Sequence, residues 1–205
     1  MMKIGIMGGT FNPIHMAHLI LAQSALEQLG LDKVLFMPSK RPPHKRNEII
    51  TEDWHREKMV ELAIKDNPYF ELSRIELTRE GTTYTADTLQ ELTIQNPDVT
   101  YYFIMGADSL FQMESWWEPQ VIFRLAHIVA AVRGNETRQE LRDQAELLSS
   151  KYGAFIHILN TPYLDIASHD LRNMSGKGCS IRYYVPDAVC DYIMEHHLFS
   201  GKGQK

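Results

Sequence analysis

A short apolar run leads into two glycines and then two histidines in the sequence Lys3-Ile4-Gly5-Ile6-Met7-Gly8-Gly9-Thr10-Phe11-Asn12-Pro13-Ile14-His15-Met16-Ala17-His18. This pattern predicts a buried strand, a glycine turn and the start of a helix. Gly8 and Gly9 carry no side chains that would keep an anion away from the backbone N–H groups. The helix directs its unpaired N–H groups and the positive end of its dipole to the same place. The stretch therefore predicts a phosphate site where the strand meets the helix.

The two histidines stand three residues apart at the start of the predicted helix. Residues at that spacing leave one face of a helical turn, so the imidazoles of His15 and His18 would converge on the phosphate site. The alternative is that the glycines form a plain turn and the histidines are surface residues. The stretch is not a Walker A loop, because no Gly-Lys-Ser/Thr sequence follows the turn.

The composition is that of an ordinary globular protein, with 205 residues of which 44 % are hydrophobic and 23 % are charged. We expect one domain over 1–199 and a frayed tail over 200–205. The net charge of -5 argues against nucleic-acid binding, which usually needs a basic face.

The cysteine content and the hydropathy pattern bear on the compartment. Cys179 and Cys190 form no close CxxC pair, so neither a disulfide scaffold nor a cysteine zinc site is indicated. The N-terminus lacks the apolar core of a signal peptide, and no apolar run approaches the length of a membrane span. We therefore expect a cytoplasmic protein that does not associate with membranes.

Strand and helix patterns alternate along the chain. Strands are predicted at 4–7, 34–37, 101–105, 128–132 and 155–159, with a further extended segment at 70–77. Helices are predicted from Thr51 as N-cap to about 66, from 81–85 to about 94, after Pro119, over 137–150, after Ser168 and from Pro186 to about 197. This order predicts an α/β fold with a doubly wound parallel sheet, right-handed crossovers and a small C-terminal helical part. An α+β arrangement is the alternative.

Two later stretches are placed to join the phosphate site. The basic segment 38–50, which contains His44 and Lys45, should form an exposed loop at the carboxyl end of the second strand, where ligands of doubly wound sheets bind. Its charges are equally consistent with a solvated loop. Asp108 follows Gly106 at the end of a buried strand and suits a ribose hydroxyl, or else it caps a helix.

Aromatic and anion-binding side chains complete the candidates. Trp116 and Trp117 are adjacent, so at least one of them should be partly exposed or should line a cleft. Ser168 can cap a helix while Arg172 projects along the same face one turn later, and the pair would make a second anion site. A cap with a surface arginine is the plainer interpretation.

The first stretch resembles the (T/G)GTFDPxHxGH signature of the nucleotidylyltransferase superfamily, with Asn12 and Ala17 replacing its Asp and Gly. Further matches to the bacterial nicotinate-nucleotide adenylyltransferases run nearly end to end: 42–45 to PPHK/R, 84–89 to SYTxxTL, 106–110 to GxDSL, the Trp pair, Arg133, 166–172 to ISSTxIR and 180–186. Ala167 and His169 depart from the ISSTxIR pattern. The resemblance implies a Rossmann-like nucleotidylyltransferase fold.

The same resemblance implies an adenylyl transfer from ATP to nicotinate mononucleotide that gives nicotinate adenine dinucleotide and pyrophosphate. Mg2+ would enter bound with ATP, and no dedicated metal ligands are expected in the protein. The implied residues are His15, His18, Lys45 and Arg172 for catalysis; Gly8, Gly9, Thr10, Phe11, Gly106, Asp108, Ser168 and Arg172 for ATP; and His44, Lys45, Tyr84, Thr85, Trp116, Trp117 and Arg133 for the mononucleotide.

Two rival functions stay open at this point. One is another adenylyltransferase on the same fold, with phosphopantetheine or nicotinamide mononucleotide as acceptor; the Trp pair disfavours phosphopantetheine, which has no aromatic ring to stack. The other is a nucleotide sensor without catalysis, which retention of both histidines, Lys45 and Arg172 disfavours. The resemblance is compatible with a homodimer, and the sequence does not fix the oligomeric state.

Overall fold

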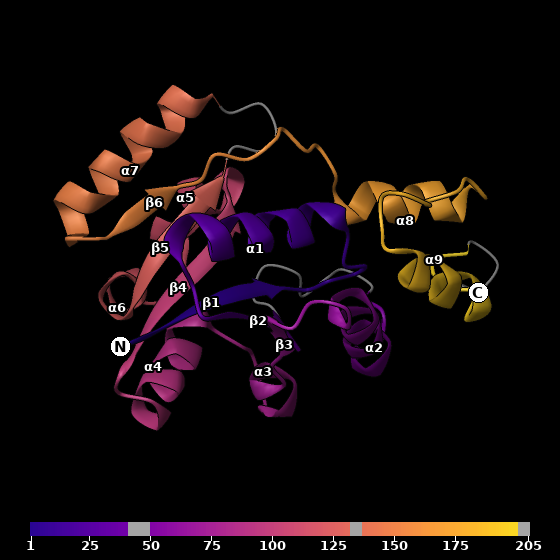
Figure 1. Cartoon of the computed structure of the whole chain (residues 1–205), viewed down its shortest axis with the longest axis horizontal. Helices are drawn as coiled ribbons and strands as arrows, with labels where there is room; N and C mark the ends of the chain where they lie inside the picture. The colour runs from indigo at the N-terminus through magenta and orange to yellow at the C-terminus, as the bar shows by residue number, and fades with distance from the viewer. Residues whose placement is uncertain (41–49, 132–136, 201–205) are drawn as a thin grey trace.

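The computed structural model describes residues 1–40, 50–131 and 137–200 of the chain. Its centre is a six-stranded parallel sheet in the order β3-β2-β1-β4-β5-β6 (Figure 1). The strands are β1 (Met2–Gly9), β2 (Lys33–Pro38), β3 (Phe70–Leu72), β4 (Val99–Gly106), β5 (Ala126–Ala131) and β6 (Ile156–Ile158). This order is that of a doubly wound Rossmann-type sheet, and the predicted fold class is confirmed.

Helices cover both faces of the sheet. They are α1 (Met16–Leu29), α2 (Asp53–Ile64), α3 (Ile75–Thr78), α4 (Thr85–Gln95), α5 (Ala107–Gln112), α6 (Pro119–Leu125), α7 (Arg138–Tyr152), α8 (Ser168–Gly176) and α9 (Asp187–Glu195), with a 3-10 turn η2 (Met113–Ser115). One core joins the sheet to α1, α2, α8 and α9, and the other joins it to α4, α5, α6 and α7. Figure 1 shows α2, α8 and α9 gathered at the end of the sheet toward which β1 runs. Within the described ranges, no helix is long and apolar enough to cross a membrane.

The middle of the sheet is where the chain changes direction. β1 and β4 are neighbours, and β1 is followed by α1 and β2 on one side while β4 is followed by α5 and β5 on the other. Buried residues of β1 face both cores, with Ile4 and Ile6 in one and Met7 in the other. The crevice outside the carboxyl ends of β1 and β4 is therefore the topological switch point, where ligands bind in such sheets.

Two predicted elements differ from the structure in the region after β2. Glu52, not Thr51, is the N-cap of α2, and the Thr51 carbonyl instead accepts a hydrogen bond from the Arg56 side chain. The extended segment predicted at 70–77 ends at Leu72, and the chain turns into the short helix α3. The apolar alternation was misleading there because a helical turn, not a strand, buries Leu77.

Helix ends in the second half of the chain also test the sequence prediction. The capping box of Thr137 and Glu140 at the start of α7 is confirmed. The prediction that Ser168 caps α8 is wrong, because Ala167 is the N-cap and Ser168 is the first helical residue. Pro186 is the N-cap of α9 and not its first residue. The predicted frayed tail falls almost wholly on 201–205, outside the described residues.

Candidate active site

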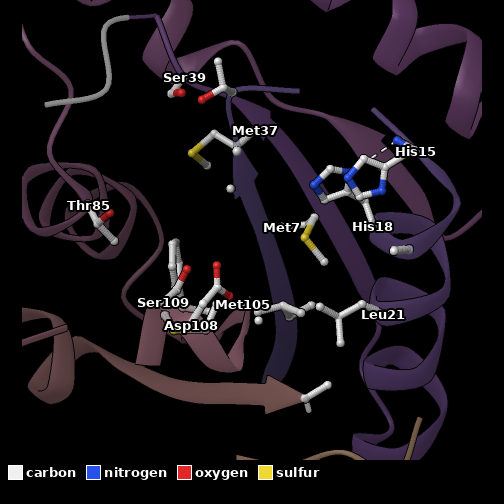
Figure 2. Close-up of a pocket in the computed structure, with 18 of the residues that line it drawn as sticks. Met7, His15, His18, Leu21, Met37, Ser39, Thr85, Met105, Asp108 and Ser109 are labelled. Atoms are coloured by element: carbon white, nitrogen blue, oxygen red, sulfur yellow. Dashed lines mark hydrogen bonds between the residues drawn. The ribbon is translucent and has the colours of Figure 1, made fainter. Parts of the chain in front are cut away.

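A cleft with a volume of about 300 Å³ lies at the carboxyl ends of β1 and β4. The residues on its walls come from the glycine turn (Gly8, Gly9, Thr10), the start of α1 (His15, Ala17, His18, Leu21), the end of β2 (Met37, Ser39), the segment 83–85, the segment 106–109 with α5, and the Trp116–Trp117 pair. Figure 2 shows His15 and His18 at the start of α1, across the cleft from Asp108 and Ser109. Stretches far apart in the sequence thus meet at the predicted switch point.

The glycine turn leaves little room for side chains. A Cβ atom on Gly9 would lie 3.1 Å from the Phe11 ring, and one on Gly8 would lie 3.3 Å from the Phe103 ring. Phe11 itself is buried in the core with a positive φ of 49°, so any contact with a ligand would come from its backbone. Tight packing behind the turn leaves its backbone as the surface that faces the cleft.

His15 and His18 form one unit at the start of α1. Their ring centroids are 3.7 Å apart in a stacked arrangement, and His15 is 1 % exposed. The backbone N–H of His15 donates to Nδ1 of His18 over 3.3 Å. Because Nδ1 of His18 is an acceptor, the proton of its neutral ring must lie on Nε2. His18 can therefore present an N–H donor to an anion in the cleft.

Ser168 and Arg172 on α8 contact the signature turn and are not among the residues that line the cleft. The Ser168 hydroxyl donates to the Pro13 carbonyl over 2.9 Å, and Arg172 Nη1 donates to the Asn12 carbonyl over 2.8 Å. Asn12, one of the departures from the signature, contributes its backbone to this contact. The observed bonds fasten α8 to the turn.

An aromatic wall closes the other end of the cleft. The rings of Tyr84 and Trp117 have centroids 5.5 Å apart, and Trp117 is 56 % exposed. Trp116 packs edge-on against Phe103, with 6.1 Å between centroids. The prediction that at least one tryptophan is partly exposed or lines a cleft is confirmed. Tyr84 is also the N-cap of α4, so Thr85 is the first residue of a helix that starts at the cleft.

Asp108 lies in the first turn of α5, exposed and on the cleft wall. The helix N-cap is Gly106, so the alternative prediction that Asp108 is the cap is wrong. His44, Lys45 and Arg133, which the sequence places at the mononucleotide side, lie outside the described residues. Among the residues that the structure describes, no group of three or more His, Cys, Asp or Glu side chains could hold a metal ion.

Sequence reasoning missed Glu76, a buried carboxyl on the cleft wall. Glu76 is 9 % exposed, and the Thr88 hydroxyl donates to it over 2.8 Å. Arg79 Nη1 donates to the same hydroxyl over 2.8 Å. Burial raises the pKa of Glu76, and Thr88, Arg79 and Thr83 offset part of the effect. Glu76 lies within the segment 70–77 that was predicted as extended, and alternation there placed it opposite the apolar residues Ile75 and Leu77, so nothing indicated that α3 would bury this side chain.

The raised pKa of Glu76 predicts how Glu76→Gln changes stability with pH. A carboxyl whose folded pKa lies above its unfolded value stabilises the protein below the unfolded pKa and loses that contribution as the pH rises through the folded pKa. Glutamine does not titrate, so the Tm of the variant minus that of the wild type should increase from pH 4 to pH 8. Thermal denaturation across this range measures it, with the exposed Glu80→Gln as the control for loss of one charge. A difference that is flat with pH, or that falls, would contradict the prediction.

The chain is similar in sequence and in fold to known nucleotide-transferring enzymes. Residues 6–174 match the model of the cytidylyltransferase-like family. The chain is 48 % identical to a probable nicotinate-nucleotide adenylyltransferase of Lachnoclostridium phytofermentans, over 97 % of this chain and 100 % of that protein. It is 38 % identical to the protein of the same name from Symbiobacterium thermophilum, over 97 % and 96 % of the two chains. A solved structure of Plasmodium falciparum nicotinic acid mononucleotide adenylyltransferase, complexed with NaAD, shares the fold with a TM-score of 0.78 at 22 % identity, covering 97 % of this chain and 98 % of that one.

Proposed function

Because the chain belongs to the cytidylyltransferase-like family and, within it, to the nicotinate-nucleotide adenylyltransferases, we propose that its cleft joins ATP to nicotinate mononucleotide. The products are nicotinate adenine dinucleotide and pyrophosphate, in NAD biosynthesis. One observation carries the proposal: two different features face the same cleft. The first is the glycine turn with the two stacked histidines, and the second is the aromatic wall of Tyr84 and Trp117 at the start of α4. The first feature suits a triphosphate and the second a flat ring with a charged substituent.

The protein itself forms no covalent bond in this reaction. An oxygen of the mononucleotide phosphate attacks the α-phosphorus of ATP, the new P–O bond forms, and the bond from the α-phosphorus to the bridging oxygen breaks in line. The bond electrons leave with pyrophosphate, and no covalent enzyme intermediate is needed. The rate must then come from positioning and from stabilisation of charge on the phosphates. The Nε2–H of His18 supplies a donor for that charge.

Mg2+ bound with ATP would neutralise part of the charge on the leaving pyrophosphate. The described cleft wall fits this arrangement, because Mg2+ bound to a nucleotide takes most of its ligands from phosphates and water, and the described residues hold no cluster of carboxylates that would compete for it. We assign Asp108 to the adenosine side of the cleft.

Further assignments complete the proposal. By the match of 42–45 to the family's basic loop, Lys45 orients the attacking phosphate and His44 supports the same substrate. Tyr84, Thr85, Trp116 and Trp117 take the nicotinate ring, and Arg133 lies on the same side by its sequence position. Arg172 and Ser168 act on the β and γ phosphates, with their observed bonds to the signature turn as the support for their place near it.

Pyrophosphate release tests the proposal. The chain should release pyrophosphate from ATP when nicotinate mononucleotide is added, and the dinucleotide should appear in equal amount by chromatography. Parallel reactions with nicotinamide mononucleotide, with 4′-phosphopantetheine and without acceptor separate the rival adenylyltransferases. Release that depends on 4′-phosphopantetheine would change the substrate assignment. ATP binding without turnover in any of these reactions would instead indicate a nucleotide sensor.

A further inference from the structure

Arg56, the fourth residue of α2, is completely buried, with an exposed fraction of 0 %. Its guanidinium donates through Nε to the Thr51 carbonyl (3.0 Å) and through Nη1 to the carbonyls of Thr10 (2.7 Å) and Ser39 (2.8 Å). Nη2 pairs with the carboxylate of Asp53 one turn earlier on the helix. Three separate segments of chain therefore meet on one side chain.

A buried guanidinium is a costly way to fill this space. Burial lowers the pKa of Arg56, and the bond and charge of Asp53 offset only part of that effect. The Asp53 side chain is 41 % exposed, so solvent weakens the pair. Apolar residues of similar volume often stabilise such a position at least as well as an ion pair. The hydrogen bonds to backbone carbonyls, which only a planar fork of donors can make, set Arg56 apart from such a residue.

Two of these carbonyls belong to residues that line the cleft. Thr10 ends the glycine turn and Ser39 follows β2, and both line the cleft, whereas Arg56 does not. The Ser39 N–H also donates to the Gly9 carbonyl over 2.9 Å, so turn and strand end are already joined in front of Arg56. Figure 2 shows Ser39 at the edge of the cleft. Arg56 thus fastens the two walls from behind.

Because the peptide bond is planar, holding a carbonyl in place also fixes the direction of the N–H group that follows it. Among the described residues the one cis peptide bond is Asn12–Pro13, so the Thr10–Phe11 and Ser39–Lys40 units are trans. In a trans unit the C=O and the following N–H point in opposite directions. When Arg56 holds the two carbonyls toward itself, the N–H groups of Phe11 and Lys40 are turned to the other side.

We propose that Arg56 is a positioning residue for adenylyl transfer: by holding the Thr10 and Ser39 carbonyls, it fixes the direction of the turn's N–H donors toward the triphosphate of ATP. The proposal rests on the function proposed above. Arg56 touches no substrate and acts through the backbone of the turn. Nη1 alone holds both carbonyls, while Nε and Nη2 fix the direction of the guanidinium through Thr51 and Asp53. Lysine keeps the charge, but its side chain is one bond shorter than that of arginine and has no second nitrogen to fix its direction, so its ammonium cannot take the place of Nη1.

The test compares Arg56→Lys with Met59→Ala, which removes a fully buried side chain from the same helix and, by its place on α2, serves as a matched loss of core packing. At a temperature well below both Tm values, Arg56→Lys should lower kcat by about 10- to 100-fold, as a small misplacement of reacting groups does. Met59→Ala should lower Tm while keeping kcat within about twofold. Equal kcat values for the two variants would overturn the proposal, because the loss would then follow stability alone.

Chemical rescue and ATP binding keep the inference separate from the proposed reaction. Millimolar guanidinium added to Arg56→Ala should restore part of kcat in a saturable way, whereas the same concentration of ammonium should not; no difference between the two would count against the fork. Binding of a non-hydrolysable ATP analogue, measured by calorimetry, should be about tenfold or more weaker in Arg56→Lys than in Met59→Ala. If the wild type binds ATP but releases no pyrophosphate, the proposed function fails, and this affinity ratio still decides the role of Arg56.

Discussion

Replacement of His18 by alanine should lower kcat by about a hundredfold or more while leaving the fold intact, as loss of a preorganised donor to a transition state does. The Nδ1 atom of His18 accepts the His15 N–H, so Nε2–H is the donor that the variant lacks. His18 is only partly buried and sits in the first turn of α1, so the core does not depend on it. Turnover at saturating substrates and far-UV circular dichroism together measure the effect. Near-normal turnover in a folded variant would remove His18 from the mechanism.

His18→Gln separates the donor from the helix cap. Glutamine at the third helical position can accept the N–H of the N-cap residue, as in a capping box, so it preserves the start of α1. It also carries an amide donor, but at another distance and direction from the cleft. We expect His18→Gln to regain the Tm of the wild type and only a small part of kcat. Full recovery of kcat with glutamine would show that the alanine effect came from the helix start and not from the imidazole.

The sequence alone predicted those parts of the site that depend on residues close together in the chain. Gly8 and Gly9 leave the turn open, and the three-residue spacing of the histidines places both rings at the start of one helix; each feature depends on neighbours within about one turn of chain. The doubly wound parallel sheet followed from the alternation of short apolar runs with helices, which leaves few topologies. Once the sheet was predicted to be doubly wound, the position of the crevice at the switch point followed from the fold.

The part that sequence did not predict depends on contacts between distant segments. Nothing in the sequence around Arg56 distinguishes it from a solvent-facing arginine of an amphipathic helix, and its partners Thr10 and Ser39 lie 46 and 17 residues away. Arg172 was expected to face an anion, yet its described bond runs to a backbone carbonyl of the turn 160 residues earlier. Direction of a long polar side chain is set by tertiary packing, which short-range patterns do not encode.

The second large effect concerns the acceptor: kcat/KM for nicotinate mononucleotide should exceed that for nicotinamide mononucleotide by about tenfold to over a hundredfold, the range given by one hydrogen bond to a charged group. A carboxylate only accepts hydrogen bonds and carries charge, whereas the amide is neutral and also donates. The start of α4 favours the carboxylate, because no side chain of the described residues caps it and its first intrahelical bond is that of the Thr88 N–H to the Tyr84 carbonyl. The N–H groups before Thr88 therefore lie at the positive end of the helix, next to the aromatic pair of Tyr84 and Trp117.

Thr85→Pro tests this origin of selectivity directly. Proline at the first helical position removes one N–H and is otherwise well tolerated there, and Tyr84 already has the extended backbone (φ -106°, ψ 138°) that a residue before proline adopts. The variant should therefore fold, and its preference for nicotinate should fall by about tenfold through a lower kcat/KM for nicotinate alone, as loss of one charged hydrogen bond predicts. Thr85→Ala is the control, because it removes the hydroxyl and keeps the N–H, and its preference should stay near that of the wild type. An unchanged preference in Thr85→Pro would exclude this N–H as its source, and equal kcat/KM values in the wild type would contradict the acceptor assignment while leaving adenylyl transfer in place.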